Sequence, residues 1–119
     1  MHERHFRHAL ALFSSAQFFE AHEALEDTWR EASPHSPMRR HLQGLVQVAV
    51  AFHHQSTGNR VGARSVLARA LRNLQGAEAS FPDLELEQLR AQLAAWQGFL
   101  AKEEPGGQAP PLPKITSSR

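Results

Sequence analysis

FFEAHEALEDTWR, residues Phe18–Arg30, is the stretch around which the rest of this 119-residue chain can be organised. Glu, Ala and Leu dominate it and neither Gly nor Pro interrupts it, so the composition predicts an α-helix. At about 100° per residue, an apolar stripe runs along one face of such a helix. The stripe consists of Phe18, His22, Leu25 and Trp29. We expect this face to enter a hydrophobic core.

A histidine lies near the centre of that predicted stripe. His22 is followed four residues later by Glu26, and Glu23 lies on the same flank of the helix. An imidazole and two carboxylates beside an apolar face are costly to bury without partners. Those partners are each other, another helix, a ligand or a metal ion, and this group is therefore the candidate functional site.

The composition restricts the class of protein. A chain of 119 residues suits one domain with a single core. The formal net charge is +1, which argues against nucleic acid or a membrane surface as a partner. The absence of cysteine excludes disulfides and thiolate metal sites, and suits a reducing compartment. Since no apolar run near the N-terminus resembles a signal peptide, we expect a cytoplasmic protein.

The remaining chain predicts further helices, about five in all, and an all-α fold built of antiparallel hairpins. Ser36-Pro37 is a typical helix start, and Gly58-Asn59 is typical of a tight connection between two helices. Phe81-Pro82-Asp83 predicts a break, with Asp83 capping the last helix. The predicted helical ranges are 3–14, 18–32, 37–55, 60–75 and 84–102.

The helix predicted over residues 37–55 is the most apolar, so we expect it to be central. One polar stripe interrupts it, formed by Gln43, Gln47 and His54, with Arg40 beside them. A polar stripe on a buried helix faces either water or another polar stripe. The helix that carries His22 offers such a partner.

The last sixteen residues, EPGGQAPPLPKITSSR, differ in composition from the rest. Proline and glycine predict an extended or disordered tail over residues 104–119, following a helical domain over residues 1–103. A proline-rich segment can also be the ligand of a proline-reading protein, although an ordinary terminal tail is the simpler interpretation.

Three motifs occur in order along the first helices. They are FEAHE over Phe19–Glu23 with Leu25-Glu26 and Trp29, then LQGLVQ over Leu42–Gln47 with Ala49 and His54, then Gly58-Asn59 with Gly62-Ala63. With these motifs, about residues 6 to 75 resemble a family of small prokaryotic proteins described as domain of unknown function 309. The resemblance implies a compact multihelical fold, often oligomeric, without an established activity. It singles out His22, Glu23 and Glu26, here called the Glu/His motif, and it implies no particular reaction.

Several interpretations of the candidate site stay open. The ligand-binding candidates are His22, Glu23, Glu26, Trp29, Gln43, Gln47 and His54. A divalent metal such as Zn, Mn or Fe would use His22, Glu23, Glu26 and His54, because imidazoles and carboxylates suit these ions. However, Glu26 stands where a His-Glu-x-x-His zinc helix has its second histidine. An organic ligand or a partner's peptide is a further alternative.

The structural interpretation is a hydrogen-bonded network that fixes how two helices dock. In that case His22 bonds to a carboxylate or to a glutamine of the helix over residues 37–55, and Glu26 pairs with Arg30. The indole N–H of Trp29 would then find an acceptor nearby.

Two function classes follow from these interpretations. The first is a non-enzymatic binding or structural domain that forms a homo-oligomer or takes a small ligand or a protein partner. The second is a metal-dependent hydrolase with His22 and Glu26 as ligands and Glu23 as ligand or general base. Whether the chain is an enzyme is therefore left open. Four arginines on the helix over residues 60–75 scatter around its polar arc, which argues against a nucleic-acid surface.

Overall fold

Each helix that the sequence predicts is present in the computed structural model, which describes residues 3–102 and 106–118. Within these ranges there are five α-helices and one short 3-10 helix. Their bounds are α1 (Glu3–Ser14), α2 (Phe18–Glu31), α3 (Pro37–Ser56), α4 (Arg60–Asn73), η1 (Ala77–Ala79) and α5 (Leu86–Leu100). The predicted all-α fold class is confirmed. None of these helices is long and apolar enough to span a membrane.

Local capping signals set two of the helix starts as predicted. The Ser36 hydroxyl accepts a hydrogen bond from the Arg39 amide at 3.3 Å, and Pro37 occupies the first turn of α3, where no amide hydrogen is needed. The Asn59 side chain accepts from the Gly62 amide at 2.9 Å at the start of α4. Gly58 precedes it with φ of 84°, a left-handed conformation that glycine adopts without a steric penalty. These caps place α3 and α4 in a tight hairpin.

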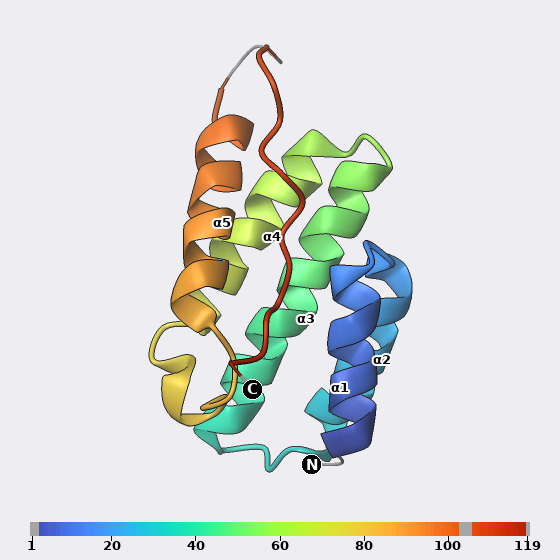
Figure 1. Cartoon of the computed structure of the whole chain (residues 1–119), viewed down its shortest axis with the longest axis vertical. Coiled ribbons are helices and arrows are strands. Elements are labelled where there is room, and N and C mark those ends of the chain that lie inside the picture. The colour runs from blue at the N-terminus through green and yellow to red at the C-terminus, as the bar shows by residue number, and fades with distance from the viewer. Residues whose placement is uncertain (1–2, 103–105, 119) are drawn as a thin grey trace.

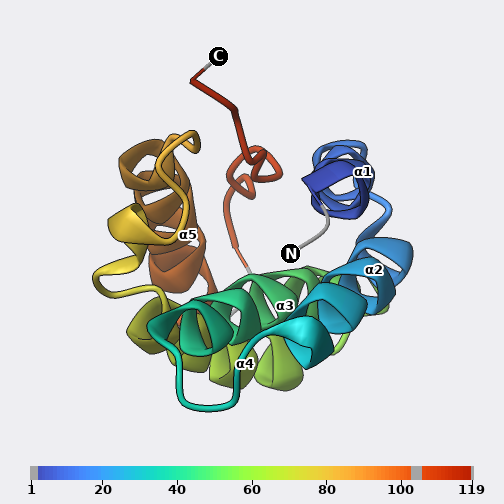
Figure 2. The ribbon, with the colours of Figure 1, turned by 90° about the horizontal axis from the view of Figure 1, so that it is seen from below.

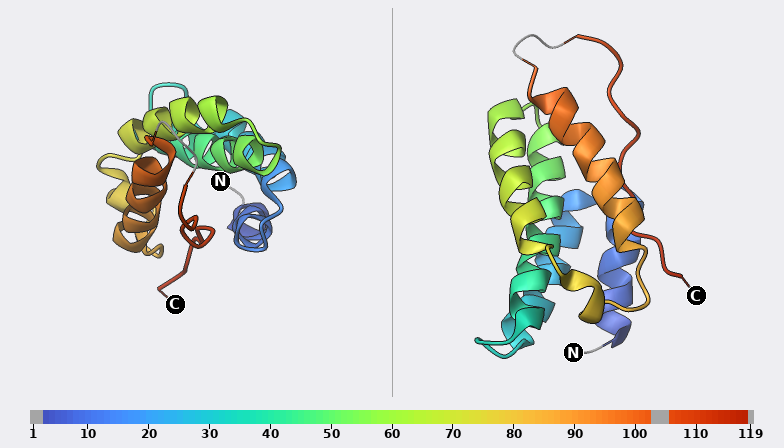
Figure 3. Two further views of the ribbon diagram at one scale, coloured as in Figure 1. Left: turned by 90° about the horizontal axis from the view of Figure 1, so that it is seen from above. Right: turned by 90° about the vertical axis from the view of Figure 1, so that its left-hand side faces the viewer.

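The helices follow one another around a curve, and each packs against the next in the chain. α2, α3 and α4 form a layer, while α1 and α5 lie on the same side of it at its two ends (Figures 2 and 3). The C-terminal segment runs between α1 and α5 (Figure 1). The layer therefore has an inner face, covered by α1, α5 and the C-terminal segment, and an outer face that no described element covers.

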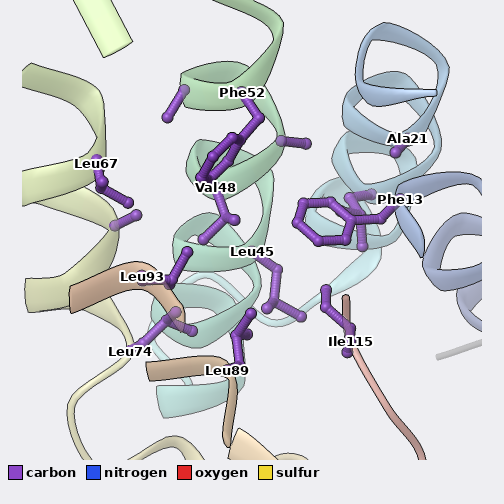
Figure 4. Close-up of a cluster of buried hydrophobic side chains, with 14 of the residues drawn as sticks. Phe13, Ala21, Leu45, Val48, Phe52, Leu67, Leu74, Leu89, Leu93 and Ile115 are labelled. Carbon is purple, nitrogen blue, oxygen red and sulfur yellow. The ribbon is translucent and has the colours of Figure 1, made fainter. Parts of the chain in front are cut away.

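The hydrophobic core fills the inner side of the layer, with α3 at its centre. Leu45, Val48 and Phe52 of α3 are buried, and the Phe52 ring packs edge-on against Trp96 of α5 at 5.2 Å between centroids. Phe13 of α1 points toward the same region (Figure 4). α3 is thus the central helix, because neighbours cover it on both sides and its apolar arc is wide enough to meet them.

The C-terminal segment contributes to this core. Pro113 and Ile115 are buried, and Ile115 lies among the labelled core side chains in Figure 4. The indole Nε1 of Trp96 donates to the Pro111 carbonyl at 2.8 Å. The segment is extended, as proline-rich sequences favour. The predicted boundary between a domain over 1–103 and a tail over 104–119 falls next to residues 103–105, which are outside the described ranges.

The start of the last helix differs from the prediction. α5 begins at Leu86 and not at Leu84, and the residue that precedes it is Glu85 and not Asp83. The reason is a long-range contact, because the Glu85 amide donates to the Thr116 carbonyl at 2.9 Å and Leu84 forms an isolated antiparallel bridge with Ser117. This pairing holds Leu84 in a bridge directly after the turn at Pro82-Asp83, and the helix begins only after it.

Candidate functional site

The buried face of α2 is not the stripe that the sequence suggested. Phe18, Ala21, Leu25 and Thr28 are the buried residues of this helix. His22 lies at the edge of that face with its side chain 26% exposed, so the prediction that it sits near the centre of the apolar stripe is wrong. The two stripes share Phe18 and Leu25, and a small rotation separates them. The observed one keeps an imidazole and a carboxylate partly in water, which avoids a large desolvation cost.

The Glu/His motif forms a chain of polar contacts along α2. The imidazole Nδ1 of His22 lies 3.2 Å from the Phe19 carbonyl oxygen, and its Nε2 lies 3.2 Å from Glu26 Oε2. Because a carbonyl only accepts, Nδ1 carries a proton, and Nε2 donates to Glu26 when the imidazole is charged. Arg30 then donates to Glu26 Oε1 at 3.1 Å and to Asp27 at 3.2 Å. All of these partners belong to one helix.

The polar residues of α3 face the opposite neighbour. Gln47 accepts from the Asn73 side chain of α4 at 2.8 Å, and His54 Nδ1 lies 3.2 Å from the Asn59 side-chain nitrogen. Gln43 is exposed. The predicted site is therefore divided, since His22 and Glu26 interact within α2 whereas Gln47 and His54 interact with α4 and the residue that caps it. The expected hydrogen bond between His22 and a glutamine of α3 is not among the contacts of His22 in the described structure.

Trp29 also differs from the expectation. Its indole Nε1 is buried and has no hydrogen-bond partner among the described residues, so the prediction of a nearby acceptor is wrong. Instead the Arg39 guanidinium stacks 4.2 Å from the centroid of the Trp29 ring, and Arg39 Nη1 donates to the Ala32 carbonyl at 3.1 Å. This cation–π contact joins the end of α2 to the start of α3. It stabilises the packing of α2 against α3, which the structural interpretation expected a hydrogen bond of His22 to fix.

The four candidate metal ligands do not lie around one point, although His22 and Glu26 contact each other. Glu23 is exposed on α2, and His54 is engaged beside α4. Across residues 3–102 and 106–118, no group of three or more His, Asp or Glu side chains could hold a metal ion. The metal hypothesis for His22, Glu23, Glu26 and His54 accordingly gains no support from this geometry and stays a prediction.

The outer face of the layer carries an exposed aromatic residue at its α2 end. Phe19 is 46% exposed, and its ring lies between the rings of His22 and His53 at centroid distances of 5.6 and 5.3 Å. Val61 at the start of α4 is 69% exposed. Single exposed apolar side chains are common on folded domains, whereas contiguous apolar patches rimmed by polar residues mark contact surfaces.

Opposite charges flank α3. On α2, one basic residue, Arg30, accompanies the carboxylates of Glu20, Glu23, Glu26, Asp27 and Glu31. On α4 there is no acidic residue, and the basic ones are Arg60, Arg64, Arg69 and Arg72. As a sequence pattern these arginines suggest a nucleic-acid surface, which their scatter around the helix argues against. A comparison of the net charge of successive helices would have found the contrast.

One buried histidine, His41 on α3, is not among the residues predicted from the sequence, and it is 3% exposed. Its Nε2 lies 3.2 Å from Arg40 Nη2 and its Nδ1 contacts the Ser80 hydroxyl. Burial, and then the neighbouring positive charge of Arg40, lower the pKa of His41. The signal was available, because His41 lies four residues before Leu45 on the apolar arc of the predicted helix.

A shallow cavity of about 420 Å³ opens at the turn between α2 and α3. Arg39, Arg40 and Gln43 are among its lining residues, so Gln43 is the member of the predicted set that borders it. His22 and Glu26 do not line it. The motif is consequently part of an open helix surface and not of this cavity.

Comparisons with known proteins support the family resemblance. The family described as "Domain of unknown function (DUF309)" matches residues 6–66, which reach from α1 into α4. The uncharacterized protein YpuF of Bacillus subtilis (strain 168) is 35% identical over 74 residues, covering 62% of this chain and 42% of that protein. An uncharacterized protein of Aquifex aeolicus (strain VF5) is 27% identical over 81 residues, covering 68% of this chain and 24% of that protein.

The chain thus spans less than half the length of either relative. The residues that the family model matches contain the Glu/His motif and the connection between α3 and α4. Since the family match covers half of the chain and includes the predicted motifs, the chain belongs to the family of domain of unknown function 309.

Proposed function

We propose that this chain is a non-enzymatic binding domain that associates with a second copy of itself through the outer face of α2, α3 and α4. The observation that carries this proposal is the charge contrast across α3, with five carboxylates and one arginine on α2 and no carboxylate on α4. The α4 arginines available for such a contact are the exposed Arg64, Arg69 and Arg72, because Arg60 donates to the Phe99 and Lys102 carbonyls at the end of α5. In this role the Glu/His motif supplies the acidic half of a contact surface.

A twofold arrangement satisfies both helices at once. If two copies meet with their outer faces together and the twofold axis parallel to α3, then α2 of each copy lies against α4 of the other. Such a contact uses the same surface on both copies, as is usual in dimers. Complementary charge sets the register and excludes the alternative in which α2 faces α2, because like charges repel.

Apolar residues would supply the rest of the binding free energy. Phe19 and Val61 are the exposed anchors at the edges of the face, and the His22 ring packs beside Phe19. The contacts of Glu26 with His22 and Arg30 hold its carboxylate in place before binding, which reduces the entropy lost on association. An aromatic anchor with a charged surround is a common composition for protein interfaces.

A non-enzymatic role fits the surroundings of the motif. His22 and Glu26 are bonded to each other on an open helix surface, and the cavity at the α2–α3 turn is lined by other residues. Enzymes usually hold their reacting groups in a concave site that excludes water. In the two relatives the matching region is part of a longer protein, which suits a module that brings chains together.

The test is a charge exchange between copies. One variant carries Glu20→Lys, Glu23→Lys and Asp27→Lys on α2, and the other carries Arg64→Glu, Arg69→Glu and Arg72→Glu on α4; all six side chains are exposed. We expect the wild-type chain to be a dimer by light scattering and each variant alone to be a monomer. An equimolar mixture of the variants should restore a dimer, because each reversed helix then faces its reversed partner.

The control is Glu87→Lys on α5, an exposed charge away from this face, which should leave the dimer intact. A monomeric wild-type chain at roughly 100 μM, well above the usual concentrations for stable dimers, would refute the proposal. So would variants that stay dimeric alone, since charge would then not direct the contact.

A further inference from the structure

The C-terminal segment lies in the groove between α1 and α5 in the way that a bound peptide lies in its receptor. Its residues alternate, because Pro113 and Ile115 are buried while Leu112 and Lys114 are exposed. The Ile115 side chain lies among those of the core (Figure 4). An extended peptide that presents every second side chain to a groove is a recurrent mode of recognition. The segment lies on the inner, concave side of the helical curve (Figure 2).

Side chains of the groove hold the backbone of this segment. Gln92 of α5 accepts from the Lys114 amide at 2.7 Å, and Ser14 of α1 accepts from the Ile115 amide at 3.2 Å. Trp96 donates to the Pro111 carbonyl at 2.8 Å. These three contacts do not depend on the side chains of the segment. They would therefore hold any extended peptide that fits the apolar positions.

Strand-like pairing continues these contacts at the end of the segment. The Glu85 amide donates to the Thr116 carbonyl at 2.9 Å, and the Ser118 amide donates to the Asp83 carbonyl at 2.7 Å. Residues 83–85 thus act as a short edge to which the segment adds a strand. Addition of a strand to such an edge likewise depends on hydrogen bonds to the backbone of the added segment and not on its sequence.

The groove extends beyond what the segment fills. A cavity of about 690 Å³ continues from Ile115 and Ser117 along α1, and Phe6, Leu10, Phe81 and Leu84 line its apolar part. Ser117 comes next after Pro113 and Ile115 on the same side of the extended segment, because side chains alternate along such a chain. Serine is small and leaves this cavity open. A large apolar side chain at that position would cover the aromatic and leucine side chains.

We propose that the α1–α5 groove is a binding site for extended segments of other proteins with proline, isoleucine and a large apolar residue at alternate positions. Residues 110–118 of the chain itself occupy this groove. They have Ser117 at the third of these positions, where serine buries less apolar surface than a large apolar residue would. This inference goes beyond self-association, since it concerns the inner face and not the outer one. A partner segment binds by displacing the resident one, so the resident segment sets the affinity that a partner must exceed.

The experiment uses the full chain with Ile115→Asp, which removes the resident segment from the groove by placing a charge at a buried position. The probe is the labelled nonapeptide PPLPKITSS, residues 110–118 of the chain. We expect this peptide to bind the variant, and to bind the wild-type chain at least about tenfold more weakly, because a tethered competitor acts at roughly millimolar effective concentration. A peptide with Ser117→Leu should bind the variant about tenfold more tightly, since a leucine side chain leaves water.

Matched controls are the full chain with Lys114→Asp, whose new charge faces solvent and which should behave as wild type, and a peptide with Ile115→Asp, which should not bind. Equal affinity for wild type and the Ile115→Asp chain, or no binding to that chain when folded, would overturn the proposal. If the Ile115→Asp chain is unfolded alone, added PPLPKITSS should restore its helical circular dichroism. Failure to restore it would equally overturn the proposal, as would a Ser117→Leu peptide that binds no better.

Discussion

A buried imidazole shows how strongly one residue's surroundings can constrain its charge. Arg40 presents only donors, so Nε2 of His41 must accept from it and Nδ1 must carry the proton that bonds to Ser80. A second proton on Nε2 would face the guanidinium. A backbone hydrogen bond with Gln75, and then the charge of Glu78, act in the opposite direction on the pKa of His41. Arg90 acts with Arg40, and burial and Arg40 dominate and lower it.

This environment predicts a dependence of stability on pH. The pKa of His41 is lower in the folded chain than its ordinary value of 6.5, so the unfolded chain takes up the proton first as the pH falls. The neutral imidazole's contribution to the free energy of unfolding is therefore complete above pH 6.5 and declines as the pH falls below that value. The slope is at most about 1.4 kcal/mol per pH unit. Urea unfolding of wild type and His41→Gln between pH 7.5 and 5.5 measures it, and we expect the variant to lose the slope.

The exposed His35 provides the comparison, because His35→Gln should keep the wild-type slope. If His41→Gln and wild type lose stability in parallel over this range, the buried imidazole is not the titrating group. Glu78 does not interfere, because Arg90 lowers the pKa of its carboxyl from an ordinary value of 4.5, which puts that titration below the range.

At the scale of elements, the α3–α4 hairpin depends on close approach. A Cβ atom built on Gly44 of α3 would lie 2.9 Å from Cγ and Cδ2 of Leu74 and 3.3 Å from the backbone carbon of Asn73. Leu74 is fully buried and cannot move aside easily. The glycine thus permits the distance at which Gln47 reaches Asn73, and it belongs to the LQGLVQ motif for this steric reason.

Gly44→Ala should accordingly lower the free energy of unfolding by about 1–3 kcal/mol, as overpacking of a tight contact usually does. Gly98→Ala on α5 is the matched change, because nothing lies within 4 Å of a Cβ at that position. Alanine is the better helix former by about 1 kcal/mol, so Gly98→Ala should raise stability. Urea titration of both variants distinguishes the two effects, and a stabilised Gly44→Ala would show that α4 tolerates a larger separation.

At the scale of the whole molecule, the two proposed surfaces lie on opposite sides of the α2–α3–α4 layer and differ in chemistry. The outer face combines exposed charges with Phe19 and Val61, whereas the inner groove buries Pro113 and Ile115. Salt screens exposed charges, with a Debye length of about 10 Å at 0.1 M and 3 Å at 1 M, but does not weaken apolar burial. The two surfaces should therefore respond differently to ionic strength.

We expect self-association to weaken as NaCl rises from roughly 50 to 500 mM, while peptide binding to the Ile115→Asp chain stays nearly constant. Sedimentation equilibrium measures the first and fluorescence anisotropy the second. Dimerisation that strengthens with salt would instead point to an apolar contact, such as exchange of C-terminal segments between copies. The measurement thereby separates the two surfaces.

Local signals in the sequence were sufficient for the helices. The caps at Ser36 and Asn59, the left-handed Gly58 and the apolar periodicity predicted the element order and the fold class, because each depends on residues within a few positions of one another. The family motif was readable in the same way, since it is a contiguous pattern. These features are properties of the chain before it packs.

Tertiary structure alone decided the rotation of α2, the division of the Glu/His set from Gln47 and His54, and the start of α5. Each is a choice between arrangements that are locally almost equivalent, and distant contacts select one of them. Ile115 bonds to Ser14 from 101 residues away, and the pairing of residues 83–85 with the C-terminal segment delays the last helix. A periodicity of a few residues cannot contain that information, because burial and hydrogen bonding between distant segments are settled only when the whole chain packs.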